Sequence, residues 1–235
     1  MQYVILCSLL ILTGGACRCI RRNPRAYRRF AWMLGLLIAG AMLIQEGVLL
    51  RAGLLTWATG LPLHLCSLMG VLTLPMLLTR CRTLVSAALY LGVPGAALAL
   101  VFPAVLPTPW PILTAAAFHT LHAGLACAPL LPIALGWRPV PSDTLRAGGV
   151  LVLAGLIAMR VNPLCGGNYL FLAGPVAGTP LAWLGQWGLL PYRLLLGTLA
   201  ICTLAAEAGI TTLVRKGERP ARTLPRDGMD DPSPK

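Results

Sequence analysis

Three histidines and a cysteine in apolar surroundings are the side chains of this sequence best suited to chemistry. His64 and Cys66 lie two positions apart in LPLHLC, and His119 and His122 lie three positions apart in FHTLH. A thiolate attacks acyl esters, and a neighbouring imidazole can accept the thiol proton and return it to the leaving group. These residue types favour cysteine-dependent acyl transfer or thioester hydrolysis, provided that a cysteine and a histidine meet.

Helical spacing decides which of these side chains can meet. Pro62 suits the first turn of a helix, where its missing N–H is not needed, and predicts that a helix begins near residue 62. On that helix His64 and Cys66 would point about 200° apart and would not form a pair. His119 and His122, at i and i+3, share a helix face. We therefore predict an inter-helix pair of Cys66 with His122 or His119. Depth along the two helices slightly favours His119, and His64 becomes a packing or supporting residue.

Further polar residues are predicted in the same half of the membrane. Glu46 lies near the outer end of its predicted helix and is a candidate to orient a histidine. Asn168 and Tyr169 lie in a loop rich in Gly and Pro, where the Asn168 amide could stabilise an oxyanion or bind a lipid headgroup. Polar groups at membrane depth are costly, and they are functional candidates by default.

The composition indicates a membrane protein. Of the 235 residues, 57% are hydrophobic and 11% are charged, and the mean hydropathy is +0.77. Soluble domains carry about 25% charged residues. Seven apolar segments approach the roughly 20 residues that cross a bilayer. They are 2–17, 31–50, 61–79, 83–102, 111–135, 145–161 and 190–213. We predict an all-α, polytopic transmembrane helix bundle of about seven spans over residues 1–214, followed by a disordered cytoplasmic tail at 215–235.

The net charge of +12 is concentrated beside the apolar segments. Basic clusters in such places set topology and contact anionic lipid, so we expect membrane phospholipids rather than nucleic acid as partners. With seven spans, sixteen of the 19 Lys and Arg residues fall on the side of the membrane that carries the cluster at 18–29. We therefore predict a multi-pass protein of the cell (inner or cytoplasmic) membrane, with its N-terminus outside and its C-terminus inside.

Two other functions stay open. His64, His119, His122 and Cys66 could bind a metal ion or haem, because neutral imidazole is a common ligand. None of their spacings is diagnostic of a metal site, and we predict no cofactor. The other alternative is a small-solute transporter or channel, although the sequence has no recognisable repeats or paired broken helices.

Three stretches of the chain form a specific combination: LPLHLCSL at 61–68, His122-Ala123-Gly124, and GGNYLFL at 166–172 followed by GTPLAWLGQW. Together they resemble the YwaF-type family of bacterial integral membrane proteins, over about residues 31–200. That family is similar in turn to animal transmembrane protein 164, an acyltransferase that acts on ether phospholipids through a Cys and a His. The resemblance implies Cys66 as nucleophile and His122 as base. Thr198 stands where the family pattern has an acidic residue, and His119 is additional to that pattern.

Overall fold

A computed structural model describes residues 2–103, 105, 107–175 and 181–217. Within these ranges every regular element is helical, which confirms the predicted all-helical bundle. The longer elements are α1 (Gln2–Arg22), α2 (Tyr27–Arg51), α3 (Leu65–Thr79), α4 (Arg82–Ala87), α5 (Val93–Val101), α6 (Pro111–Cys127), α7 (Leu130–Ala134), α8 (Asp143–Cys165) and α10 (Leu189–Gly217). The shorter ones are η1 (Pro24–Ala26), the π-helical turn η2 (Ala88–Gly92), η3 (Tyr169–Phe171), α9 (Leu181–Leu184) and η4 (Gly185–Trp187).

Six helical stretches of the described chain are long and apolar enough to cross a membrane, judged by length and composition. They are Gln2–Arg22, Pro24–Arg51, Arg82–Val101, Pro111–Ala134, Asp143–Cys165 and Leu189–Gly217. Helix α3 has 15 residues and is also apolar. It is about 22 Å long, whereas the hydrocarbon core of a bilayer is about 30 Å thick. The six stretches and α3 correspond to the seven predicted segments of a multi-pass membrane protein.

Helix α3 begins at Leu65, so the predicted start near residue 62 was too early. Before it, the Thr59 hydroxyl donates to the carbonyl of Leu54 over 2.7 Å and accepts from the Thr56 amide over 2.9 Å. Such hydroxyl bonds favour turns over helix. Pro62 therefore lies in this turn region, and His64 is the N-cap residue, with an extended backbone.

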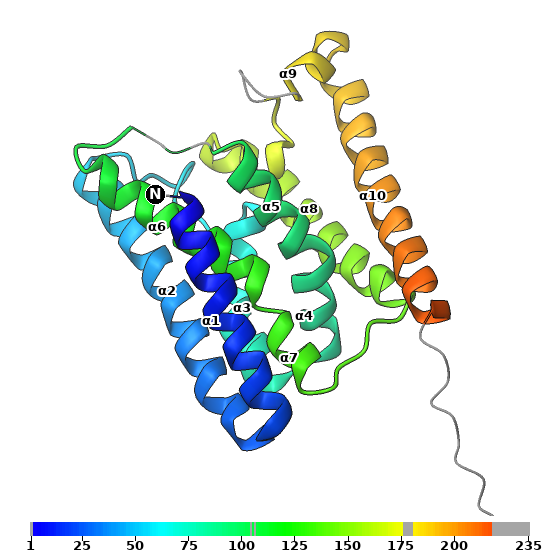
Figure 1. The fold of residues 1–235 in the computed structure, drawn as a ribbon. Coiled ribbons are helices and arrows are strands. Elements are labelled where there is room, and N and C mark those ends of the chain that lie inside the picture. The colour runs from blue at the N-terminus through cyan, green and yellow to red at the C-terminus, as the bar shows by residue number, and fades with distance from the viewer. Residues whose placement is uncertain (1, 104, 106, 176–180, 218–235) are drawn as a thin grey trace, which may run out of the picture.

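Helix α6 is largely buried and contacts α1, α2, α3 and α5 (Figure 1). On one of its faces, a Cβ at Gly124 would lie 2.6 Å from Ile38 Cγ1 of α2, so only glycine permits this approach. On a second face, Ala123 and Cys127 pack against Leu9 of α1. Small residues let membrane helices approach closely, and here they fix the rotation of α6 between α1 and α2.

Helices α4 and α5 form one span, interrupted by the π-helical turn η2. A π-helical turn adds one residue to the α-helical repeat and so changes the direction of every residue that follows. Gly95, just after this turn, faces the start of α3.

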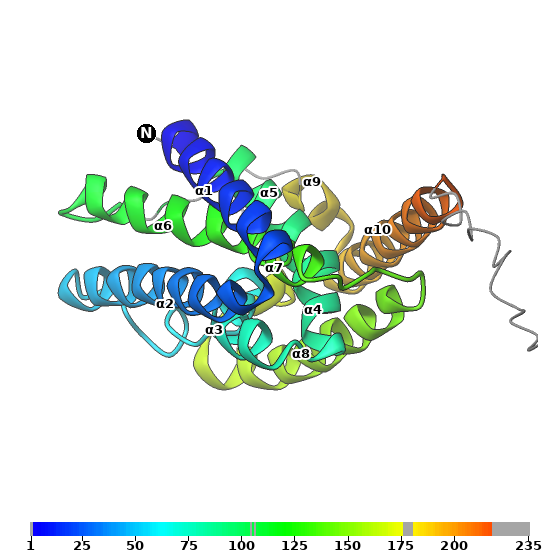
Figure 2. The ribbon, with the colours of Figure 1, turned by 60° about the horizontal axis from the view of Figure 1, so that its bottom comes forward.

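Helix α10 lies at the periphery, beside α8 (Figures 1 and 2). Several of its apolar side chains are more than half exposed and suit contact with lipid: Leu194, Leu199, Ile201 and Leu213. The helix continues to Gly217. Residues 215–217 of the predicted tail are therefore helical, and residues 218–235 lie outside the described part of the chain.

A network of hydrogen bonds around Asp143 joins the N-terminal ends of α4 and α8. Both oxygens of the fully buried Asp143 carboxylate accept hydrogen bonds from Arg82, at 2.8 and 2.7 Å, and one also accepts from Arg146 at 2.9 Å. Arg215 of α10 donates to the Pro139 carbonyl nearby, over 3.3 Å. Basic residues that the predicted topology assigned to one side of the membrane thus lie at one end of the bundle. We call it the arginine end; it carries Arg25, Arg28, Arg80, Arg82, Arg146 and Arg215. The start of α3 lies at the other end, the Cys66 end.

Candidate functional site

Cys66 is the second residue of α3 and a half-buried free thiol. Its Sγ lies 3.7 Å from the position that a Cβ at Gly95 of α5 would occupy. No side chain in the described residues caps the N-terminus of α3, so its first backbone N–H groups are free of side-chain partners. The positive end of the helix dipole and these N–H groups favour a negative charge that develops at the start of α3.

His122 is buried in α6 and has a defined hydrogen-bond partner. Its Nδ1 lies 2.7 Å from the carbonyl oxygen of Phe118, one turn earlier. A carbonyl can only accept, so the neutral imidazole carries its hydrogen on Nδ1 and leaves a lone pair on Nε2. The Phe118 ring packs against the imidazole, with 4.1 Å between the ring centroids. This tautomer is the one in which Nε2 can accept a proton.

The faces of α6 determine the side to which His122 points. His122 lies about 100° from Ala123, which faces α1, and about 160° from Gly124, which faces α2. A third direction is occupied by Leu121, which faces Gly70 of α3. The remaining neighbour of α6 is the span of η2 and α5. By elimination, we infer that His122 points toward this span, which Cys66 also borders.

The predicted Cys–His pair is not joined directly. Across the described residues, no hydrogen bond links Cys66 to His119 or to His122. His119 is buried one turn before Ala123, on the side that α1 covers, and its Nδ1 has no hydrogen-bond partner in the described chain. The two histidines are neighbours on α6, and His119 is the one that lies closer in direction to Ala123 and α1.

His64 packs against aromatic rings. Its ring centroid lies 5.1 Å from that of Tyr169 and 5.5 Å from that of Phe171, both in η3. Because His64 precedes the helix, the predicted angle of about 200° between it and Cys66 does not apply. Its direction is set by these aromatic contacts, and burial lowers the pKa of its imidazole.

Tyr169 connects the loop before α3 to the end of α8. Its fully buried hydroxyl donates to the Trp57 carbonyl over 2.8 Å and accepts from the Leu61 amide over 3.0 Å. The Asn162 side chain holds the backbone of Tyr169 from both sides: Oδ1 accepts from its N–H at 2.8 Å, and Nδ2 donates to its carbonyl at 3.1 Å. We call His64, Tyr169, Phe171 and Asn162 the aromatic cluster; it fixes the chain just before Cys66.

Asn168 and Glu46 were also predicted for the site. The Asn168 side-chain oxygen accepts from the amides of Ala173 and Gly174, and its nitrogen donates to the Gly174 carbonyl, so the amide organises its own loop. Burial raises the pKa of the Tyr169 hydroxyl, and the hydrogen bond with the Leu61 backbone partly opposes this rise. Glu46 has a buried Oε2 that has no hydrogen-bond partner in the described residues.

Two important residues were not predicted as part of the site. Asn162 acts through its hydrogen bonds with Tyr169, seven positions later. The only sign of this in the sequence was an Asn near a helix end, shortly before NYL. Gly95 is recognisable only once α5 is placed against α3. No group of three or more His, Cys, Asp or Glu side chains within the described ranges has the arrangement of a metal site.

Comparisons with known proteins give the family. No curated protein and no solved structure matches the chain. The model of the TMEM164 family matches residues 1–206, which include every helix of the bundle except the last residues of α10. A match over this much of the sequence shows that the chain belongs to the TMEM164 family.

Proposed function

We propose that this protein transfers acyl chains of membrane phospholipids through Cys66. The observation that carries the proposal is the hydrogen bond from His122 Nδ1 to the Phe118 carbonyl, on the side of α6 that borders α5. It leaves Nε2 as a proton acceptor next to the span that Cys66 also borders. Membership of the TMEM164 family and the apolar helices support a lipid substrate.

The reaction has two balanced halves. In the first, Cys66 Sγ attacks the acyl carbonyl of a phospholipid while His122 Nε2 takes the thiol proton. The C–O bond of the ester then breaks, the acyl chain stays on sulfur as a thioester, and the proton passes to the leaving lysophospholipid oxygen. In the second, His122 takes a proton from the hydroxyl of an acceptor, whose oxygen attacks the thioester. The C–S bond then breaks, the acyl chain leaves as an ester of the acceptor, and His122 returns the proton to the Cys66 sulfur. Water as acceptor would give hydrolysis.

The N-terminus of α3 is our candidate for the oxyanion site. The N–H groups of Cys66 and Ser67 are in the first helical turn, which no described side chain caps. Backbone N–H groups aimed at a developing oxyanion contribute strongly to catalysis, and a helix N-terminus adds its dipole. Asn168, whose amide bonds to its own loop, is better suited to positioning the loop over a headgroup.

His119 has a supporting role in this proposal. His119 lies on the α1 side, so we assign the base to His122 and reserve His119 for packing beside Phe118. Catalytic hydrogen bonds often tighten only when substrate is bound, so the Cys66–His122 contact is expected with lipid in place.

With the N-terminus outside, this site opens toward the outer leaflet of the cell membrane.

The test is capture of the acyl-enzyme. Purified protein is mixed with a phospholipid that carries an isotope-labelled acyl chain, and the mass of the intact protein and of its peptides is measured. We expect one added acyl group at Cys66 that hydroxylamine removes, and no acyl group in Cys66→Ala. The matched control is Cys165→Ala, another half-buried cysteine at the same end. Full acyl transfer by Cys66→Ala would contradict the proposal.

A further inference from the structure

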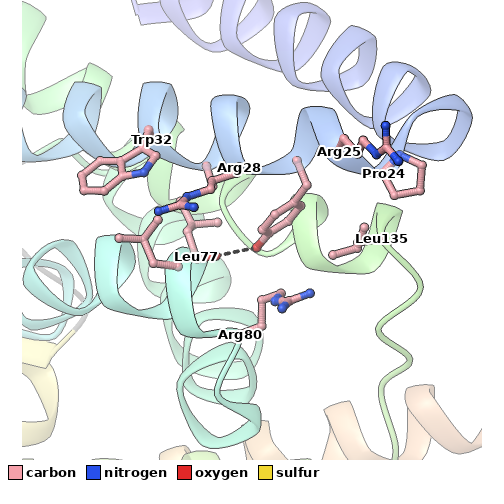
Figure 3. Close-up of a pocket in the computed structure, with 10 residues that line it drawn as sticks. Pro24, Arg25, Arg28, Trp32, Leu77, Arg80 and Leu135 are labelled. Atoms are coloured by element: carbon pink, nitrogen blue, oxygen red, sulfur yellow. Dashed lines mark hydrogen bonds between the residues drawn. The ribbon is translucent and has the colours of Figure 1, made fainter.

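A cavity at the arginine end has the composition of an anion site. It has a volume of ≈ 490 Å³ and lies between the first turn of α2 and the last turn of α3, far along α3 from Cys66. Arg25, Arg28 and Arg80 line it, and none of the described residues that line it is acidic. Figure 3 shows Arg28 and Trp32 on α2 facing Leu77 and Arg80 at the end of α3.

The walls of this cavity are held in place by specific contacts. The buried Tyr27 hydroxyl donates to the Leu77 carbonyl over 2.7 Å and ties the start of α2 to the end of α3. Arg80 ends α3 in the left-handed conformation, at φ 55°, and its guanidinium lies 5.9 Å from the centroid of the Tyr27 ring. Arg80 is therefore held beside the cavity by the backbone and by a cation–π contact.

The positive charge of this cavity has no carboxylate beside it. Among the described residues, none of Arg25, Arg28 and Arg80 forms an ion pair with Asp or Glu. The helical stretch that contains α2 begins at Pro24, where the Asn23 side chain accepts from the Arg25 amide over 3.2 Å, and neither η1 nor the first turn of α2 has an acidic residue. A helix N-terminus favours negative charge, so arginines there are unfavourable for α2 until an anion is present.

We propose that this cavity binds the phosphate headgroup of an anionic phospholipid from the adjacent leaflet. Guanidinium groups bind phosphate through paired, charge-assisted hydrogen bonds, and basic pockets between membrane helices suit anionic headgroups. The phosphate belongs to a lipid because Leu77, Leu78 and Trp32 form apolar walls, and Trp32 continues into the exposed Met33 and Leu36 of α2. The acyl chains lie along this face of α2. The proposal does not depend on acyl transfer at Cys66.

The experiment measures thermal unfolding in mixed micelles of phosphatidylcholine with increasing phosphatidylglycerol. A ligand that binds the folded state raises the melting temperature with its concentration. We expect such a rise for the wild type, and about tenfold or weaker apparent affinity for Arg25→Gln/Arg28→Gln/Arg80→Gln, which loses several charge-assisted bonds. The matched control, Arg18→Gln/Arg22→Gln/Arg29→Gln, removes the same charge from exposed arginines that do not line the cavity.

Three outcomes would overturn the proposal. Equal loss in both triple variants would indicate a diffuse attraction of lipid to the whole basic cluster. Stabilisation of the wild type by glycerol phosphate as strong as that by phosphatidylglycerol would indicate a site for a free phosphate. An unchanged phosphatidylglycerol response in Arg28→Gln alone would show that the headgroup is not bound in the cavity that Arg28 lines. That single variant is expected to fold, because it removes a positive charge from a helix N-terminus.

Discussion

The two ends of α3 show how differently one helix can be anchored in the same bundle. At its start, the chain is fixed mainly by uncharged groups: the hydroxyl of Tyr169, the amide of Asn162 and the ring of His64. At its end, Arg80 and Arg82 join a charged region in which Asp143 accepts from two arginines. Uncharged hydrogen bonds position a thiol without placing a competing charge beside it. The arginines at the other end hold helices together and leave positive charge available for an anion.

The largest expected effect that separates these two ends is on the rate of acyl transfer. His122→Gln removes the base and is expected to lower the rate by about 10²- to 10⁴-fold, because that is the range that general base catalysis contributes. The stabilisation by phosphatidylglycerol should be unchanged. The measurement is single-turnover acyl transfer from a labelled phospholipid.

His119→Gln is the matched control, since His119 is buried on the same helix but lies on the α1 side. We expect its rate to stay within a few-fold of the wild type. Equal losses in the two variants would assign the effect to packing around Phe118 and not to proton transfer.

The next effect concerns stability at the arginine end. Asp143→Asn leaves Arg82 and Arg146 without their carboxylate and is expected to cost roughly 3 kcal/mol, at the lower end for a buried ion pair because both arginines are partly exposed. Thermal unfolding in neutral detergent measures it. The acyl-enzyme at Cys66 should still form below the new melting temperature; its complete loss there would show that the two ends are coupled.

A smaller effect is expected at the Cys66 end. Tyr169→Phe leaves the Leu61 amide and the Trp57 carbonyl without their partner, which is expected to cost about 1–3 kcal/mol. Tyr192→Phe is the control, because Tyr192 is equally buried and its hydroxyl has no partner among the described residues. Thermal unfolding of both variants compares them, and equal destabilisation would contradict the role assigned to the Tyr169 hydroxyl.

The helices could be predicted from the sequence because their evidence is local. Apolar length identifies each span, and the alternation of arginine-rich and arginine-poor connections agrees with the arrangement of basic residues at one end. The start of α3 was wrong by three residues, since Pro62 suits a first helical turn as well as the hydroxyl-stabilised turn in which it lies.

The details of the candidate site depend on contacts between distant residues, which local patterns do not contain. The Tyr169 hydroxyl meets an amide 108 residues away, and Arg82 meets a carboxylate 61 residues away. Helical spacing correctly gave His119 and His122 neighbouring positions. It did not reveal that α1 covers one of them while the other borders α5, because that depends on Gly124 and Ala123 fixing the rotation of α6.

The π-helical turn η2 contains one residue more than a regular α-helical turn, and this single residue determines how α5 is rotated relative to α4. Deleting one residue within Ala88–Gly92 would restore a regular α-helix and rotate α5 by about 100° relative to α4. The gap beside the sulfur, now formed by Gly95, would then be filled by another residue of α5. An insertion or deletion here would therefore change which residues of α5 face Cys66, although the sequence of α5 itself would stay the same.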